Sequence, residues 1–384
     1  QGRLVGRICL NSFIWMVIFA DDVKITAGGQ DKWIVILRCI VMWLLMGTPF
    51  AWHKFRGGLE CDFVGFWLDY VNFEVGLSEK RTEWLCTWLT NTQAAGITLV
   101  RSFQEGLGRL GFSSRMLLWM KPFLSPLCAW AAAVPGGSVL KIPCLVKVTM
   151  AFILDMLNLG KCRIPCASPE GGKEELFRTD AKGALDYIVL GGWQCMNGMK
   201  TADAPWFSLR LSEKEVPWLF KEGKGSSWSS TSSELLASTV AMLIFPLGGL
   251  KSSRSAAEVI IRGGTDNSAN EALSAKRTST KMPLMLILMQ LAQASYKLGV
   301  RLALTWRPRG ENAPADDLTN EDFSKFTLTN RIHVSWNSLD FSLLSMLLAL
   351  KNEFELDLLT AKRLAPLAWV PMSKKRKVAT RTPW

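Results

Sequence analysis

Four acidic residues in the second half of the sequence have the chemistry to hold divalent metal ions. They are Asp180, Glu234, Asp266 and Asp316. Two-metal hydrolysis of a phosphodiester needs several carboxylates that converge on ions roughly 4 Å apart, one activating water and one stabilising the leaving oxygen. Mg²⁺ and Mn²⁺ prefer oxygen ligands, so carboxylates suit such a site better than histidines. Each acid taken alone has a plainer explanation, as a solvated surface carboxylate or a helix N-cap.

The segments around these acids predict a mixed sheet with helices. Strand-like and helical runs follow in the order strand, strand, strand, helix, strand, two helices, strand, helix. The strands are expected at 176–182, 188–196, 206–211, 259–262 and 301–306, and the helices at 234–244, 268–277, 283–298 and from Pro314 onward. This order predicts an α/β (α+β) fold in which a mixed five-stranded sheet carries flanking helices.

In that fold, the four acids are expected at strand ends and helix starts. Asp180 lies on the first strand and Glu234 opens the first helix, whereas Asp266 ends the fourth strand and Asp316 starts the last helix. Because strand ends and helix starts gather at one rim of a sheet, acids that are distant in the sequence can meet there.

Four short motifs surround the acids, in this order along the chain. They are Thr179-Asp180-Ala181, Ser233-Glu234-Leu235-Leu236-Ala237, Thr265-Asp266-Asn267-Ser268 and Asn312-Ala313-Pro314-Ala315-Asp316-Asp317-Leu318-Thr319. They resemble the motifs of retroelement ribonuclease H domains, most closely those of the DIRS-like and pararetrovirus-like groups. The resemblance implies a ribonuclease H-like fold whose four acids bind two Mg²⁺ or Mn²⁺ ions, and cleavage of the RNA strand of an RNA–DNA hybrid.

The likeness to ribonuclease H is incomplete at two places. Lys182-Gly183 replaces the small residues that usually follow the first motif, and Thr319-Asn320 replaces Ser-Arg in the last one. Asp317 is an alternative to Asp316 as the fourth ligand if the helix register differs.

Upstream, an apolar run over residues 8–20 ends in Phe19-Ala20-Asp21-Asp22. Those four residues resemble the reverse-transcriptase palm motif. Lys54 resembles the lysine that follows this motif in reverse transcriptases, Phe63-Val64-Gly65-Phe66 resembles the primer grip, and the helical segments near 106–127 resemble the thumb. The resemblance implies a retrotransposon-derived segment of a reverse transcriptase and ribonuclease H polyprotein, truncated at its N-terminus. Asp21 and Asp22 then form a vestigial polymerase metal site that lacks its third carboxylate, so we expect no polymerase activity from this chain alone.

We expect five regions along the chain. They are a partial palm at 1–90, thumb-like helices at 91–135, a connection or linker at 136–174, the ribonuclease H-like domain at 175–330, and a C-terminal helix with a basic tail at 331–384. The apolar stretch at 33–46 is interrupted by Arg38 and is shorter than the roughly 20 residues that span a bilayer, so it predicts a buried helix and no membrane partner.

The charge of the chain favours polyanionic partners. Lys and Arg outnumber Asp and Glu by 12 residues, and such an excess attracts phosphates, although a basic protein with no nucleic-acid role has the same composition. Lys54, Arg307 and Arg309 are the candidate contacts to an RNA–DNA hybrid or other nucleic acid, and a missing upstream polymerase portion is a further candidate partner. The run Lys374-Lys375-Arg376-Lys377 resembles a nuclear-import signal or is a tail that touches nucleic acid nonspecifically, so nuclear or cytoplasmic localisation is expected.

The cysteine and histidine content argues against other chemistries. The nine cysteines are scattered and odd in number, and there are only two histidines. This argues against a disulfide framework, a structural zinc site and Ser-His or Cys-His nucleophilic catalysis. The composition, 49% hydrophobic and 20% charged, is that of a folded protein. The alternative to a nuclease is a catalytically inactive nucleic-acid-binding remnant of a retroelement.

Overall fold

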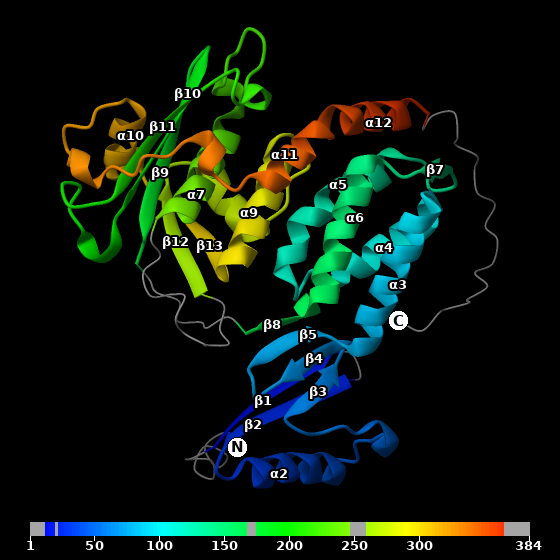
Figure 1. Cartoon of the computed structure of the whole chain (residues 1–384). Helices are drawn as coiled ribbons and strands as arrows, with labels where there is room; N and C mark the ends of the chain where they lie inside the picture. The colour runs from blue at the N-terminus through cyan, green and yellow to red at the C-terminus, as the bar shows by residue number, and fades with distance from the viewer. Residues whose placement is uncertain (1–11, 20–21, 167–173, 246–258, 365–384) are drawn as a thin grey trace. The chain divides into compact units, whose positions relative to one another are not determined.

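The computed structural model describes residues 12–19, 22–166, 174–245 and 259–364 (Figure 1). The chain divides into two compact units, residues 1–78 and 79–384. Asp21 and the basic run Lys374-Lys375-Arg376-Lys377 lie outside the described residues. Within the described ranges, no helix combines the length and hydropathy needed to cross a membrane.

The first unit consists of a hairpin, a helix and a small meander. Strands β1 (Ser12–Phe19) and β2 (Asp22–Gly29) pair antiparallel and are followed by helix α2 (Lys32–Leu45). A 3-10 turn (Trp52–Lys54) precedes the antiparallel strands β3 (Glu60–Phe63), β4 (Phe66–Asp69) and β5 (Glu74–Leu77).

The segment that resembles the primer grip forms a hairpin, in which β3 ends at Phe63 and β4 begins at Phe66. Val64 and Gly65 connect the strands with φ of 51° and 77°. Because positive φ cannot continue an extended strand, the chain reverses there.

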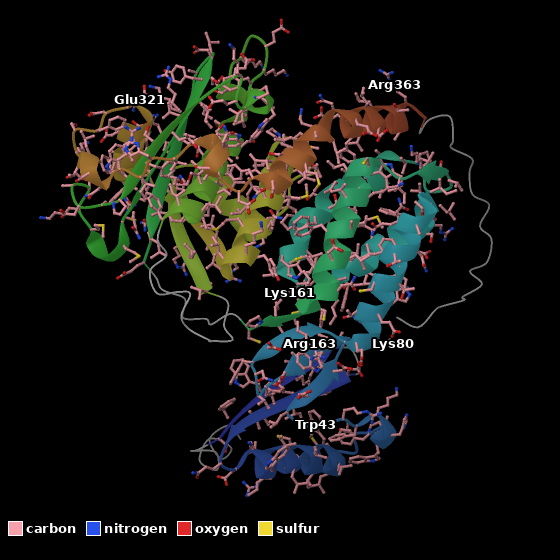
Figure 2. The ribbon with its side chains drawn as sticks, in the orientation of Figure 1. Trp43, Lys80, Lys161, Arg163, Glu321 and Arg363 are labelled. Atoms are coloured by element: carbon pink, nitrogen blue, oxygen red, sulfur yellow. The ribbon has the colours of Figure 1, made fainter. Side chains whose placement is uncertain are left out.

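A buried helix was predicted at 33–46. The helix is present as α2, but the prediction that it is buried was wrong. Only Val35 of α2 is buried, whereas Trp33 and Leu45 are 61% and 79% exposed. Trp43, labelled in Figure 2, stacks on Phe50 with ring centroids 5.9 Å apart. The helix contacts β1 and β2, and a two-stranded sheet can cover only one face of a helix that is apolar on nearly every side.

The second unit begins with four helices. They are α3 (Glu79–Ala95), α4 (Val100–Ser113), α5 (Lys121–Ala133) and α6 (Cys144–Met156). Helices α4 and α5 lie in the region where thumb-like helices were expected, and α6 lies in the segment expected to be a connection. Phe103 and Trp130 meet edge to face in this core, with ring centroids 4.9 Å apart. Strands β6 (Ile97–Leu99) and β7 (Val139–Lys141) pair antiparallel, and a π-helical turn (Leu157–Lys161) and β8 (Arg163–Pro165) follow α6.

The predicted mixed five-stranded sheet is confirmed. Its strands are β9 (Phe177–Gly183), β10 (Tyr187–Gln194), β11 (Trp206–Ser212), β12 (Val259–Thr265) and β13 (Val300–Trp306). In the described part of the chain they stand in the order β11-β10-β9-β12-β13. β9, β10 and β11 form the expected antiparallel meander, and β12 runs parallel to both β9 and β13.

Helices cover both faces of this sheet (Figure 1). They are α7 (Ser230–Ile244), α8 (Ser268–Lys276), α9 (Leu284–Leu298) and α10 (Ala313–Thr319), followed by α11 (Ser342–Ala349) and α12 (Lys351–Leu364). Side chains of β9 alternate between the two faces: Thr179 bonds to Ser238 of α7 at 2.9 Å, and the next residue, Asp180, faces Thr319 of α10.

Helix α7 begins four residues before the predicted start, so Glu234 lies in its second turn and does not open it. Of the serines that precede Glu234 in this helix, Ser233 donates its Oγ to the backbone oxygen of Ser229, the N-cap residue, at 3.2 Å. Ser238 Oγ likewise donates to the backbone oxygen of Glu234 at 3.1 Å, and this bond lets the polar side chain of Ser238 occupy a buried position in the helix.

Candidate metal centre

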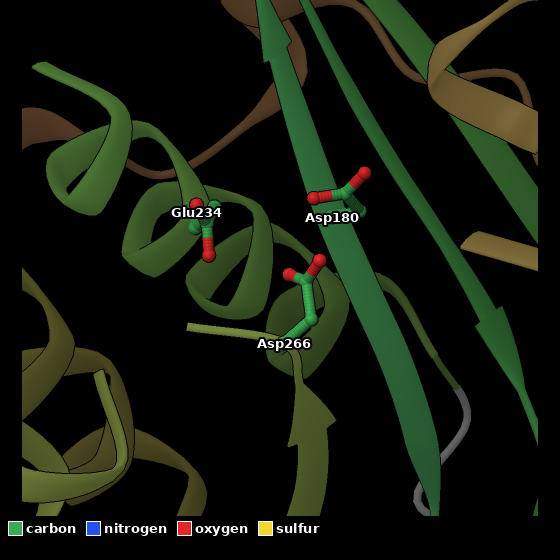
Figure 3. A group of neighbouring side chains, drawn as sticks. All are labelled: Asp180, Glu234 and Asp266. Atoms are coloured by element: carbon green, nitrogen blue, oxygen red, sulfur yellow. The ribbon is translucent and has the colours of Figure 1, made fainter. Parts of the chain in front are cut away.

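Three of the four predicted acids converge at one end of the sheet (Figure 3). Asp180 comes from β9, Glu234 from α7 and Asp266 from the residue after β12. One carboxylate oxygen of each lies within 4.8 Å of the other two. The parallel pairing of β9 with β12 explains the meeting, because Gly264 is opposite Arg178 and two residues further along Asp266 comes beside Asp180. We call these three residues the acidic triad.

Burial controls the electrostatics of the acidic triad. Asp180 and Glu234 are only 7% and 9% exposed, and Asp266 is half-buried. Burial, followed by the charge of Asp266, raises the pKa of Asp180 to about 6. Burial is also the largest cause that raises the pKa of Glu234, to about 7, and that raises the pKa of Asp266. Three anions in this position are therefore unfavourable until a cation neutralises them.

Asn267 orients Glu234, a role that the sequence did not suggest. Its Nδ2 donates to Glu234 Oε1 at 3.1 Å, and Thr265 Oγ1 donates to Glu234 Oε2 at 3.4 Å. Asn267 Oδ1 accepts from Ala269 N at 2.9 Å and caps α8. An Asn directly before a helical run is a recognisable N-cap signal, but its second contact depends on the position of α7.

Thr319 performs a similar role for Asp180. Its hydroxyl lies 3.3 Å from Asp180 Oδ2 and 2.9 Å from the backbone oxygen of Asp316. Gly191 of β10 permits this approach, because a Cβ there would lie 3.0 Å from Thr319 Cγ2 and 3.2 Å from Thr319 N. The substitution of threonine for the usual serine therefore keeps a hydroxyl beside the triad.

Asp316 stands beside the triad without joining it. Arg309 Nη2 donates to its Oδ1 and Asn320 Nδ2 donates to its Oδ2, both at 3.0 Å. Its charge nevertheless contributes, after burial, to raising the pKa of Asp180 and of Asp266. Asp317 instead bonds to Lys325 Nζ at 2.6 Å. Of the two neighbouring acids, Asp316 is the one that faces the triad, and its role as fourth ligand stays a prediction.

The predicted nucleic-acid contacts lie in both units. Lys54 is exposed in the 3-10 turn of the first unit. Arg307 Nε bonds to Glu175 Oε1 at 2.6 Å, and Arg309 bonds to Asp316. These arginines therefore flank the acidic end of the sheet, while their contact with nucleic acid remains a prediction.

The predicted polymerase site is described only in part. Asp22 is exposed at the first residue of β2, paired across the hairpin with Phe19. Within the described ranges, the group of three or more metal-binding side chains is the acidic triad, and Asp22 is not part of it. The described cysteines are free thiols.

No protein-family model matches the sequence, and no curated protein matches it. The solved structures that resemble the chain include RNase H1 of the halophilic archaeon Halobacterium salinarum, at 15% identity over 38% of this chain and 96% of that chain, with a TM-score of 0.24. The N-terminal RNase H domain of a Mycobacterium tuberculosis protein, solved as a fusion with maltose-binding protein, matches at 17% identity over 38% and 93% of the two chains, with a TM-score of 0.23. The foamy viral protease-reverse transcriptase in complex with dsDNA matches at 12% identity over 76% of this chain and 54% of its own, with a TM-score of 0.32.

Proposed function

We propose that residues 175–330 are a retroelement-type ribonuclease H that hydrolyses the RNA strand of an RNA–DNA hybrid with two divalent ions. The observation that carries this proposal is the convergence of Asp180, Glu234 and Asp266 within 4.8 Å at the end of a mixed sheet. Those residues occupy three of the four positions that the motif resemblance implies. The surplus of Lys and Arg over the whole chain, 45 against 33 acids, suits a polyanionic substrate.

The donor set of the triad fits Mg²⁺ or Mn²⁺. The convergent donors are all carboxylate oxygens, which hard divalent ions prefer. Burial raises the pKa of all three acids, and the charges of neighbouring carboxylates add to it, so full ionisation is unfavourable without a positive charge among them. When bound, the two ions supply an activated water and stabilise the leaving oxygen.

The chain's own side chains prepare the site for this chemistry. Asn267 and Thr265 fix both oxygens of Glu234, and Thr319 fixes Asp180, so the carboxylates are oriented before any ion arrives. Burial raises the pKa of Glu234 to about 7, which favours its protonated form in the absence of an ion. Ion binding therefore competes with that proton and should strengthen as the pH rises.

The test is cleavage of an RNA–DNA hybrid labelled on its RNA strand, with the full chain and Mg²⁺ or Mn²⁺. We expect RNA cleavage that falls by at least about a hundredfold in Asp180→Asn and in Glu234→Gln, because losing a metal ligand costs more than losing one of its supporting hydrogen bonds. Asp316→Asn and Asp317→Asn form a matched pair on one helix, and only the first should impair cleavage.

Two outcomes would reject this function. The first is salt-sensitive binding of the hybrid without cleavage under either ion, which would identify a nucleic-acid-binding remnant of a retroelement. The second is cleavage that survives in both Asp180→Asn and Glu234→Gln, which would trace the activity to a contaminant or to another site.

A further inference from the structure

Both carboxylate oxygens of Asp316 already have donors. Arg309 Nη2 lies 3.0 Å from Oδ1, and Asn320 Nδ2 lies 3.0 Å from Oδ2. The triad carboxylates, in contrast, face one another (Figure 3). Glu234 also accepts two hydrogen bonds, but from neutral donors, whereas the guanidinium on Asp316 repels an approaching ion.

The two donors differ in how firmly they are held. Asn320 is anchored on each side: its Nδ2 also donates to Asp316 O at 2.8 Å, and its Oδ1 accepts from Lys182 Nζ at 2.6 Å. Lys182 and Asn320 both lie in the segments that depart from the ribonuclease H pattern, and here they contact each other. The Arg309 side chain is 79% exposed, so Arg309 is the donor that can leave at little cost.

The charge of Arg309 also acts on the triad. Burial raises the pKa of Asp266, and the guanidinium of Arg309 lowers it. Arg309 thus supplies part of the positive charge that a divalent ion would otherwise supply. A guanidinium and an ion that both approach Asp316 repel each other, so Arg309 opposes ion binding at this carboxylate.

We infer that Arg309 is a positioning residue that holds Asp316 out of the ion site, so that the second divalent ion binds fully only after Arg309 has left Asp316. This inference rests on the proposed nuclease function. The triad then binds one ion by itself, and the second ion site is complete only when Asp316 is released from Arg309. A backbone phosphate of the nucleic acid is the natural acceptor for the released guanidinium, because arginine binds phosphate through two parallel hydrogen bonds. Substrate binding would thereby complete the metal site.

The test is a calorimetric titration of the nucleic-acid-free full chain with Mn²⁺. In the wild type we expect one tighter and one weaker binding event. Arg309→Gln should tighten the weaker event about fivefold, the size expected for an exposed ion pair, and leave the tighter event almost unchanged. Lys325→Gln is the matched control, because it removes the same charge from a pair with the neighbouring Asp317, and it should alter neither event.

A second measurement uses an uncleavable hybrid of DNA with 2′-O-methyl RNA. This probe should tighten the weaker Mn²⁺ event in the wild type and have no further effect on that event in Arg309→Gln, because Arg309 no longer needs to be displaced. Cleavage of the ordinary hybrid is measured on the same preparations.

The outcomes separate the two proposals. If the wild type cleaves the hybrid but Arg309→Gln leaves the weaker event unchanged or weakens it, the Arg309 inference is wrong and the nuclease stands. Equal tightening in Lys325→Gln would reduce the effect to general charge and also overturn the inference. If the wild type neither binds Mn²⁺ nor cleaves the hybrid, the nuclease proposal fails, and the inference fails with it.

Discussion

Two acidic regions of this protein were both predicted from the sequence as metal sites, and they differ in the structure. Asp21 and Asp22 are adjacent in a familiar motif, yet Asp22 is exposed at the start of a hairpin strand. The residues of the acidic triad are scattered over 87 positions, from Asp180 to Asp266, yet their carboxylates meet in a mostly buried place. The difference teaches that a metal site depends on convergence and desolvation, which adjacency in the sequence does not provide.

The surroundings of the two regions differ in the same direction. The sheet that carries the triad has a dense core, in which Trp206 and Phe177 are completely buried. In the β1–β2 hairpin, Trp15 and Ile18 are 69% and 65% exposed. A rigid frame fixes carboxylates that repel each other, whereas an exposed hairpin has no such hold on its side chains.

The largest expected difference between the regions is stabilisation by ions. At an ion concentration a hundred times the dissociation constant, binding adds about 2.7 kcal/mol to the free energy of unfolding. For the second unit, which spans residues 79–384, this corresponds to a rise in Tm of about 4 °C. Hydrogen exchange with and without Mg²⁺ should show added protection at β9, α7 and β12 and none at β1–β2. Equal added protection at β1–β2 would contradict the expected difference between the two regions.

The second difference concerns the free energy of unfolding in the absence of ions, and how a substitution that removes a charge changes it with pH. The pKa of Asp180 is raised from 3.8 to about 6, so the folded state binds this proton more tightly than the unfolded state. The resulting stability is present below about pH 4 and is lost as the pH rises through 6. Asp180→Asn should therefore match the wild type at pH 4 and exceed it by about 2–3 kcal/mol at pH 7.5.

Chemical denaturation in the presence of a chelator measures this effect of Asp180→Asn. Asp22→Asn is the control in the exposed region, and it should leave the free energy of unfolding unchanged at both pH values. A destabilised Asp180→Asn variant at pH 7.5 would mean that the triad is not under electrostatic strain.

The third difference concerns glycines on one strand of each region. A Cβ on Gly191 would press against the backbone nitrogen of Thr319 at 3.2 Å and against Leu318 Cβ at 3.0 Å. Gly191→Ala should lower the free energy of unfolding by about 2 kcal/mol, because α10 must shift from the sheet. The three atoms nearest to a Cβ on Gly28 of β2 all belong to the ring of Phe13, an exposed side chain that can rotate. Gly28→Ala should cost far less, and equal losses would contradict the account of Gly191.

The smallest effect is expected from two asparagines that each support a carboxylate. Asn267 donates to Glu234 at 3.1 Å, and Asn72 in the first unit donates to Asp69 at 2.7 Å. Each Asn→Ala change should destabilise its unit by about 1 kcal/mol. Only Asn267→Ala should also weaken Mn²⁺ binding, by about tenfold, because it alone orients a metal ligand. Weakened Mn²⁺ binding in Asn72→Ala would show that the readout is not specific to the triad.

The sequence by itself determined the frame of the site. Apolar runs bounded by turn residues located β9 to β13, and their order predicted the mixed sheet that the structure has. Three of the four acids that were predicted to meet, Asp180, Glu234 and Asp266, do so. Asp180 lies within β9 and Glu234 in the second turn of α7, and the pairing of β9 with β12 and the packing of α7 on β9 bring them to Asp266.

Only the tertiary structure decided which contacts these residues make. Adjacent residues on a helix point about 100° apart, so spacing could not tell whether Asp316 or Asp317 faces the triad, and the packing of α10 on β10 decides it. The pairing of Lys182 with Asn320 joins residues 138 positions apart. The exposure of α2 likewise depends on how much of the helix surface the neighbouring strands β1 and β2 can cover. Local sequence patterns do not identify such distant partners, because packing determines burial and the direction of side chains.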